Sequence, residues 1–323
     1  MQGKTTPEQD ANVEQSVGID ACKEFLDVHA HPGGLVMRAP NTPAGLKKIK
    51  RFLAKKRVRL IVIEATGKFH RLAQRHLHAA GYAVAVVNPL FVRLFAQSMG
   101  QFAKTDRLDA RVLAIYGATI APKARPPQPQ TIVDLQEILS TRAAAVEERT
   151  AIINRRKAAQ GDFVRKKLQK RIAQIEAHID ELEAEIMKRV KADSALLRRY
   201  ELLESIPGIG MVAALSLCIG LPELGACTGK AASLLAGLAP LADDSGKYAG
   251  ERHIKGGRAL VRTGLYFAAL TATTWNKPLK AFHERLIANG KEFKVALTAV
   301  MRKLVELANV LIKEDRPWTP VHA

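Results

Sequence analysis

Cysteine is scarce in this chain of 323 residues, which contains only Cys22, Cys218 and Cys227. The three cysteines are widely spaced and form no CxxC or Cys/His metal pattern, so nothing indicates a zinc site. An odd number of distant cysteines also argues against a disulfide framework. A reducing cytosol suits such a chain best, and we expect a cytoplasmic protein.

Long hydrophobic runs are missing as well. No apolar stretch is long enough to cross a bilayer, and no basic start followed by an apolar core marks a signal peptide. Aromatic residues make up only 5% of the chain, and Trp275 and Trp318 are not interleaved regularly with basic residues. The sequence therefore predicts no membrane partner and no aromatic platform for stacking bases.

Acidic residues are the minority charge. The chain has 31 Asp and Glu against 50 Lys and Arg, which gives a net charge of +19 and a pI near 10.0. Such an excess favours a polyanionic partner, and nucleic acid is the usual one.

The hydrophobic content of 47% is sufficient for packed cores. Strand and helix signals alternate in the first third of the chain, which predicts an α/β domain, whereas the remainder reads as helical. A proline-rich stretch between them is typical of a stiff linker. The expected segments are a disordered tail at 1–15, the α/β domain at 16–122, the linker at 123–130, long helices or a coiled coil at 131–201, and a mostly α carboxy-terminal domain at 202–323.

Several local predictions can be tested directly. Residues 17–30 read as one strand with polar interruptions, and Leu60–Glu64 reads as a strand that is buried on both faces. Asn41 is the expected cap of a helix that begins near Pro43 and continues to about Arg57. A single long helix is expected over 162–200.

A heptad seam runs along that long helix. Its apolar members recur at alternating spacings of four and three, which is typical of a coiled coil. They are Leu168, Ile172, Ile175, Ile179, Leu182 and Ile186. Because the seam covers less than three heptads, it fits an antiparallel helical hairpin as well as a coiled coil between chains.

Four acidic residues stand at positions suited to a metal site. Asp20 and Glu64 end or follow apolar strands, and Asp106 and Asp109 lie three apart on one face of a predicted helix. Hard divalent cations such as Mg²⁺ prefer oxygen ligands. A pair of these ions can stabilise both the attacking and the leaving oxygen of a phosphoryl transfer.

The alternative to a metal site is a solvated helix face. Lys104, Arg107 and Arg111 flank the two aspartates of the predicted helix, and such charge mixtures are common on exposed surfaces. Spacing by itself leaves both interpretations open.

A glycine-rich turn occurs at 206–210, with the sequence Ile-Pro-Gly-Ile-Gly. Such a turn between helices can direct backbone N–H groups at a phosphate, as in helix-hairpin-helix DNA binders. The same string also forms ordinary turns between helices, and the two readings are balanced.

A polar loop with Ser245 beside Gly246 is followed by a basic run that ends at Arg258. The run could bind phosphates through charge-assisted hydrogen bonds. Serine is a weak nucleophile unless a base or a metal activates it or its target. On residue types alone, an ordinary solvated loop is the simpler interpretation.

Taken together, the motifs resemble one known family over nearly the whole chain and in the right order. The chain resembles the insertion-sequence-110 transposases, relatives of the Piv DNA invertase. The motifs are Val17-Gly18-Ile19-Asp20 with Lys23, Glu64-Ala65-Thr66-Gly67, Lys104-Thr105-Asp106 through Asp109-Ala110, Ile206-Pro207-Gly208-Ile209-Gly210, Ala236-Gly237-Leu238-Ala239-Pro240, Asp244-Ser245-Gly246, and His253-Ile254-Lys255-Gly256-Gly257.

This resemblance implies a RuvC-like, ribonuclease-H-like amino-terminal domain with an acidic DEDD set. It implies that Asp20, Glu64, Asp106 and Asp109 hold Mg²⁺, or Mn²⁺, and that Ser245 is the nucleophile of a DNA recombinase. The expected nucleic-acid contacts are Lys104, Arg107, Gly208, Gly210, Lys247, Arg252, His253, Lys255 and Arg258.

The implied partners are donor and target double-stranded DNA, a noncoding bridge RNA, and further copies of the chain in a dimer or tetramer. The implied location is the cytoplasm of a bacterium or archaeon, in association with the nucleoid. The main alternative function is a RuvC-like endonuclease that hydrolyses branched DNA with water, and a non-catalytic DNA- or RNA-binding protein is a weaker one. The chain departs from the family at Asp243 or Ala249, where a further basic residue is frequent.

Overall fold

The structure is a computed structural model that describes residues 13–320 except 66, 102–105, 243 and 247. For residues 106–108, 248 and 249 it describes only the backbone. The chain divides into two compact units, one ending at Gln128 and the other beginning at Pro129. Each unit is described by itself below.

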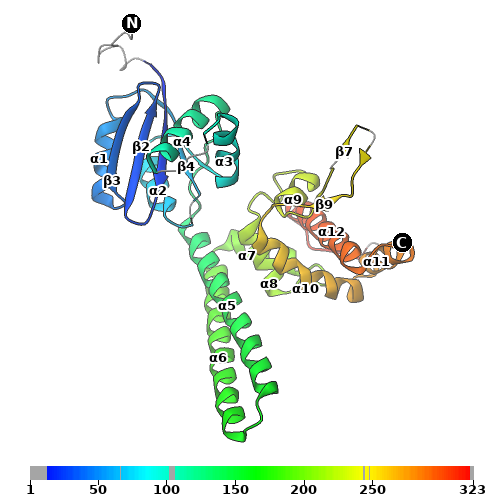
Figure 1. Ribbon diagram of the computed structural model, residues 1–323. Coiled ribbons are helices and arrows are strands. Elements are labelled where there is room, and N and C mark those ends of the chain that lie inside the picture. The colour runs from blue at the N-terminus through cyan, green and yellow to red at the C-terminus, as the bar shows by residue number, and fades with distance from the viewer. Residues whose placement is uncertain (1–12, 66, 102–105, 243, 247, 321–323) are drawn as a thin grey trace. The chain divides into compact units, whose positions relative to one another are not determined.

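The first unit is a mixed α/β domain built on one five-stranded sheet (Figure 1). Its strands lie in the order β3-β2-β1-β4-β5, with β1, β2 and β3 antiparallel and β1, β4 and β5 parallel. The elements are β1 Gln15–Ala21, β2 Phe25–His31, β3 Leu35–Pro40, α1 Pro43–Leu53, β4 Val58–Glu64, α2 His70–Ala79, β5 Val84–Val87, α3 Pro89–Ser98 and α4 Asp106–Ile120. The expected α/β class of the amino-terminal domain is confirmed.

Helices cover both faces of this sheet. One face packs Ile19 and Ile61 against Leu46 of α1 and Leu77 of α2. The other face packs the remaining strand side chains, including Leu60, Val62 and Val87, against Val92 of α3 and Val112 and Leu113 of α4. Strand β4 is therefore buried on both sides, which explains its continuous apolar run.

Two local predictions in this domain are wrong. Residues 17–30 form two strands, because the chain turns back at Cys22, whose N–H donates to the Phe25 carbonyl at 3.0 Å. The cap of α1 is Thr42, whose side chain accepts from the Gly45 N–H at 3.2 Å. Asn41 instead donates its side-chain amide to the carbonyls of Cys22 and Phe69, so it ties the helix start to neighbouring loops.

The second unit is helical apart from four two-residue strands (Figure 1). Its elements are α5 Gln130–Ala158, α6 Asp162–Ala192, α7 Ser194–Glu204, α8 Met211–Gly220, α9 Gly229–Leu235, β6 Pro240–Leu241, β7 Asp244–Ser245, β8 Tyr248–Ala249, β9 His253–Ile254, α10 Ala259–Trp275, α11 Lys277–Ala288 and α12 Phe293–Glu314. The expected mostly helical carboxy-terminal part is confirmed.

Helices α5 and α6 form a long antiparallel hairpin (Figure 1). The seam residues Ile172, Ile175, Ile179 and Ile186 are buried, and the Arg142 side chain binds Glu183 across the pair at 2.7 Å. The heptad pattern is thus used within one chain.

The predicted single helix over 162–200 is wrong at Asp193, where the chain breaks and restarts. The Asp193 carboxylate accepts from the Leu196 N–H at 3.0 Å and caps α7. An aspartate followed by serine is a strong start signal for a helix, and the apolar seam ends before it.

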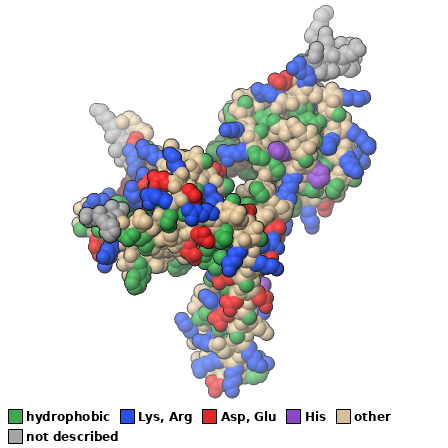
Figure 2. Space-filling view, turned by 180° about the vertical axis from the view of Figure 1, so that it is seen from behind, with side chains coloured by type: hydrophobic (Ala, Val, Ile, Leu, Met, Phe, Trp, Pro, Cys, Tyr) green, Lys and Arg blue, Asp and Glu red, His purple; other side chains and the backbone are tan. Residues whose placement is uncertain are grey.

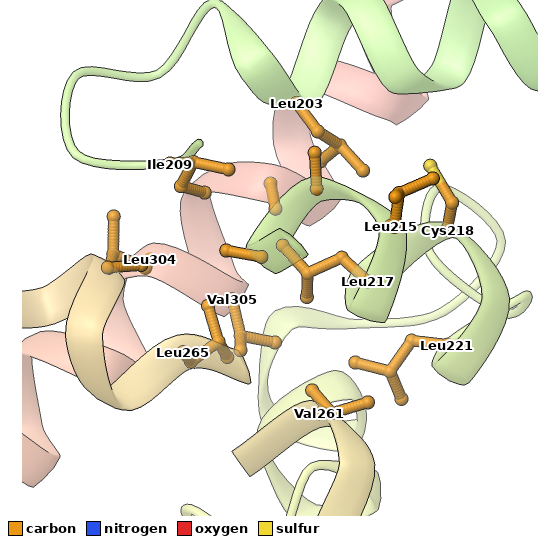
Figure 3. Close-up of a cluster of buried hydrophobic side chains, with 14 of the residues drawn as sticks. Leu203, Ile209, Leu215, Leu217, Cys218, Leu221, Val261, Leu265, Leu304 and Val305 are labelled. Atoms are coloured by element: carbon orange, nitrogen blue, oxygen red, sulfur yellow. The ribbon is translucent and has the colours of Figure 1, made fainter. Parts of the chain in front are cut away.

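One large core joins the helices of the second unit. Leu203, Ile209 and Leu217 meet Leu265 of α10 and Leu304 of α12 (Figure 3). The base of the hairpin enters the same core through apolar residues of α5 and α6, which are Leu135, Leu139, Ile186 and Val190. Within the described part of the chain, no helix is long and apolar enough to span a membrane.

Candidate active site

Two of the expected acidic residues lie side by side at the carboxyl end of neighbouring parallel strands. Ile19 of β1 is in register with Ile63 of β4, so Asp20 and Glu64 follow at the same level. Paired strands are about 4.8 Å apart. Side chains alternate along a strand, so Asp20 lies on the same face as Gly18, and Glu64 on the same face as Val62. That face is covered by α4.

Glycine brings α4 directly onto this face. A Cβ atom on Gly18 would lie 2.1 Å from the Ala110 carbonyl oxygen and 2.4 Å from the Ala114 nitrogen. A Cβ atom on Gly117 would lie 2.2 Å from Ser16 Oγ. Only glycine permits so close an approach, and it places the amino-terminal half of α4 beside the ends of β1 and β4.

The third acid comes from this helix. Asp109 precedes Ala110 on α4 and lines a cavity of about 230 Å³ together with Glu64. Arg93, Gln97 and Gln101 line the same cavity and add positive charge and amide oxygens. Carboxylate and amide oxygens suit a hard divalent cation, so the donor set fits Mg²⁺ or Mn²⁺.

Asp106 is the first residue of α4, and its side chain lies outside the described residues. In the part of the chain that the structure describes, no three His, Cys, Asp or Glu side chains are gathered closely enough to hold a metal ion. In the described geometry, Asp20 and Glu64 are neighbours on adjacent strands of the sheet. Glu64 and Asp109 line the same cavity.

An ion pair that the sequence did not reveal lies beside Asp20, on the next two strands of the sheet. Strand pairing places Asp27 of β2 opposite Asp20, and Arg38 of β3 opposite Asp27. Arg38 binds Asp27 through two hydrogen bonds, Nε to Oδ1 at 2.8 Å and Nη2 to Oδ2 at 2.7 Å. The Asp27 side chain is only 9% exposed, so the guanidinium compensates a carboxylate that water hardly reaches.

His29 lies one step further back on the same face, opposite Gly18. Burial lowers the pKa of His29, and the neighbouring charges of Arg111 and His31 lower it further. Its Nδ1 atom is buried and has no hydrogen-bond partner among the described residues. The ring is therefore packed under α4 in surroundings that favour its neutral form.

Ser245 lies on a separate structure, a narrow arm of the second unit (Figure 1). The arm begins with β6 paired to β9 and ends in a hairpin of β7 and β8, where Ser245 is opposite Tyr248. Ser245 is exposed and follows Asp244, which binds Arg252 at 2.8 Å across the arm. The expected loop therefore contains two short antiparallel ladders.

The base of the arm is fixed by a contact between two glycines. A Cβ atom on Gly257 would lie 2.1 Å from the Gly237 nitrogen, and one on Gly237 would lie 2.3 Å from the Gly256 carbonyl oxygen. Both glycines have positive φ, 71° at Gly237 and 72° at Gly257. Glycine is thus required both for conformation and for space.

Comparison with known proteins covers both units. A family model described as a transposase, of the DEDD type found in IS110 elements, matches residues 17–159, and a model described as "Transposase IS116/IS110/IS902 family" matches residues 200–284. The chain belongs to the IS110 family of transposases. The first match contains all four acidic residues and the second contains Ser245.

Two relatives of this transposase are the pilin gene-inverting proteins of Moraxella bovis and Moraxella lacunata. Each is 28% identical over 266 residues, which is 80% of this chain and 81% of the relative. A solved structure, T. thermophilus RuvC in complex with a Holliday junction substrate, covers 35% of this chain and 99% of its own at 14% identity, with a TM-score of 0.25. Membership of a transposase family implies that DNA is the substrate and that the protein cleaves it.

The basic residues expected to contact nucleic acid occupy different settings in this transposase. Arg258 binds both oxygens of Glu223, at 2.6 and 2.7 Å, and the Gly220 carbonyl at 2.6 Å. Its guanidinium therefore holds α10 to the segment after α8. His253 is 76% exposed at its side chain and lies 3.8 Å from Glu251, and Lys255 is also exposed.

The glycine turn also has a clear packing role. A Cβ atom on Gly208 would lie 2.6 Å from the Ala272 Cβ, so the turn rests directly on α10. Gly210 is the N-cap of α8 and has open space where a Cβ would lie. Lys104 and Lys247 lie outside the described residues, as does the side chain of Arg107.

Proposed function

We propose that this transposase cuts and rejoins DNA with Asp20, Glu64, Asp106 and Asp109 as ligands of Mg²⁺ or Mn²⁺ and Ser245 as the nucleophile. One observation carries the proposal. Asp20 and Glu64 end adjacent parallel strands beneath α4, which Gly18 holds close, and α4 brings Asp109 to the cavity that Glu64 lines. This arrangement supports a divalent-metal site at this edge of the sheet.

The carboxylates would hold divalent cations that stabilise the charge developing on a scissile phosphate. Ser245 Oγ attacks the phosphorus and loses its proton, so a serine–phosphate bond forms while the bond from phosphorus to the 3′ oxygen breaks. The leaving oxygen is protonated to a free 3′ hydroxyl. A 3′ hydroxyl of the new partner strand then attacks the phosphoserine and releases Ser245. Because each step exchanges one phosphate ester for another, no external energy source is required.

The arm supports this role for Ser245. Its serine is exposed at the end of a hairpin, where a DNA strand can reach it, and the Asp244–Arg252 ion pair links the two sides of the arm beside it.

We also propose that a noncoding bridge RNA guides the reaction and that the active assembly is a dimer or tetramer. The net charge of +19 is compatible with binding both RNA and DNA. Joining two duplexes requires several cleavage events, which a symmetric assembly of identical chains supplies. The serine could act on a phosphate held by its own chain or by another copy.

The direct test is to trap a protein–DNA adduct with a substrate that contains a nick near the cleavage site. Wild-type protein with Mg²⁺ should form a covalent adduct that denaturant does not disrupt, and Ser245→Ala should form none. Ser194→Ala removes an exposed serine from the same unit and should retain the adduct. Glu64→Gln should abolish cleavage altogether.

The same variants separate the competing functions. A nuclease that hydrolyses branched DNA with water needs the acids but not the serine, so Ser245→Ala would still cleave. A non-catalytic binding protein would tolerate Asp20→Asn and Glu64→Gln without any change in function. Normal recombination by Ser245→Ala would reject the nucleophile assignment.

A further inference from the structure

The free end of the α5/α6 hairpin carries a dense positive charge. Residues 155–171, which we call the basic tip, contain eight basic residues and one acid, for a net charge of +7. The basic residues are Arg155, Arg156, Lys157, Arg165, Lys166, Lys167, Lys170 and Arg171. More than a third of the net charge of the protein therefore lies in 17 of its 323 residues.

Most of this charge is not used within the protein. Arg171 binds Glu148 at 2.8 Å, and Arg165 lies 3.7 Å from Asp162. Within the described ranges, five cations of the basic tip have no acidic partner and are exposed to solvent. They are Arg155, Lys157, Lys166, Lys167 and Lys170.

The exposed cations of α6 form a stripe with one aromatic residue. Phe163, Lys166, Lys167 and Lys170 follow the spacing i, i+3, i+4 and i+7, so they share one side of the helix. Phe163 is 73% exposed, and the Lys167 ammonium lies 5.3 Å from the centre of its ring. The buried seam residues Ile175 and Ile179 lie on the opposite side, against Ala145 of α5.

The basic tip contributes little to the core. Every described residue from 146 to 171 retains solvent exposure, and the buried contacts of the hairpin lie nearer its base. Arg155 lies sixteen positions along α5 from Leu139 in the main core, which at 1.5 Å per residue corresponds to about 24 Å. Clustered like charges weaken a helix pair, so folding does not explain their presence. Lys and Arg side chains surround this end of the hairpin on the face seen in Figure 2.

We propose that the basic tip binds the sugar-phosphate backbone of a nucleic-acid duplex, through residues other than the acids and Ser245. The contact is with phosphates, because flexible lysines at the end of a helical hairpin supply charge rather than a fixed pattern of base contacts. A second copy of the basic tip would be repelled by the same charge. DNA and RNA present the same phosphate chemistry, so both duplexes are tested. The inference uses the interaction of this family with nucleic acid but not the proposed catalytic roles.

The test measures duplex binding by the full-length protein as a function of salt. Fluorescence anisotropy is recorded with a DNA duplex and with an RNA duplex of the same length, from about 50 to 200 mM NaCl. The variant carries Lys166→Gln, Lys167→Gln and Lys170→Gln. The control carries Lys188→Gln, Lys191→Gln and Lys313→Gln, which remove the same charge from exposed positions of the same unit.

For the duplex that the basic tip binds, the tip variant should lose at least about tenfold in affinity relative to the control. Its slope of log K against log salt should also be shallower by roughly 0.9 for each phosphate contact removed, or about 2.7 for three. A loss of affinity for the DNA duplex alone, for the RNA duplex alone or for both identifies the nucleic acid that the basic tip binds. If the tip variant matches the control with both duplexes, the proposal is rejected.

Failure of the proposed catalysis would look different. If Ser245→Ala still formed the covalent adduct, the proposed catalysis would fail. The difference in duplex binding between the tip variant and its control would be unaffected, because the anisotropy measurement requires no cleavage. Thermal unfolding of the tip variant should occur at or above the wild-type temperature, because repulsion is relieved, which separates lost binding from lost folding.

Discussion

At the residue scale, the candidate site lies in a row of four charged residues, one on each of four neighbouring strands. Glu64, Asp20, Asp27 and Arg38 follow one another across β4, β1, β2 and β3. The first three residues of the row are carboxylates, and the fourth is the guanidinium of Arg38. The Arg38 guanidinium compensates the charge of Asp27. Asp20 and Glu64 are the acids at the carboxyl ends of the two parallel strands.

This ion pair predicts a specific pattern of stability. Arg38→Gln leaves the Asp27 carboxylate buried without its partner, which should cost about 1–3 kcal/mol in the free energy of unfolding. The double variant Asp27→Asn/Arg38→Gln should recover much of that loss, because no buried charge remains. Urea denaturation measures both. Equal losses in the single and double variants would show that the carboxylate is not buried as described.

His29 predicts a dependence of stability on pH. Burial and the charge of Arg111 hold its pKa below the value of about 6.5 expected in the unfolded chain. Below that pH the unfolded state takes up a proton more readily than the folded state, so stability falls as pH decreases through this window. The free energy of unfolding of wild type should therefore decrease from pH 7 to pH 5 more steeply than that of His29→Gln. Parallel curves would contradict this.

At the scale of elements, glycines decide where α4 and the serine arm lie. Gly18 sets the distance between α4 and β1, and the contact between Gly237 and Gly257 closes the base of the arm. In both places backbone meets backbone, and a single methyl group would separate the elements. The glycines in these sequence motifs are therefore also required by the packing of the backbone.

The base of the arm can be tested with two matched glycines. Gly257 and Gly290 have nearly equal positive φ, 72° and 75°, but a Cβ atom clashes only at Gly257. Gly290→Ala should cost about 1 kcal/mol of stability and keep wild-type adduct formation. Gly257→Ala should displace the arm and reduce the yield of trapped protein–DNA adduct at least about tenfold. If both variants retain the adduct, the base does not position Ser245.

At the scale of the whole molecule, the proposed catalytic residues and the densest positive charge belong to different parts of the chain. The acids belong to the α/β unit, the serine to an arm of the helical unit, and the basic tip to a hairpin that leaves the main core. Separate parts can engage different stretches of nucleic acid. The proline-containing stretch at 121–129 has no helix or strand and joins the two units.

Local patterns predicted much of this protein. The apolar run of β4, the helical periods of α5 and α6 and the excess of Lys and Arg were each readable because they depend on neighbours in the chain. The motif set also indicated the family. The boundary between β1 and β2 and the break at Asp193 were missed, although polar residues interrupt the apolar pattern at both places.

The sequence by itself determined which residues carry charge, which faces are apolar and which motifs identify the family, because these properties belong to residues near one another in the chain. Only the tertiary structure decided that Asp27, paired with Arg38, lies beside Asp20, that α4 rests on Gly18 and that Ser245 lies on a paired arm. Those relations depend on strand register and on backbone contacts between segments far apart in the chain, and neither leaves a periodic signal in the sequence.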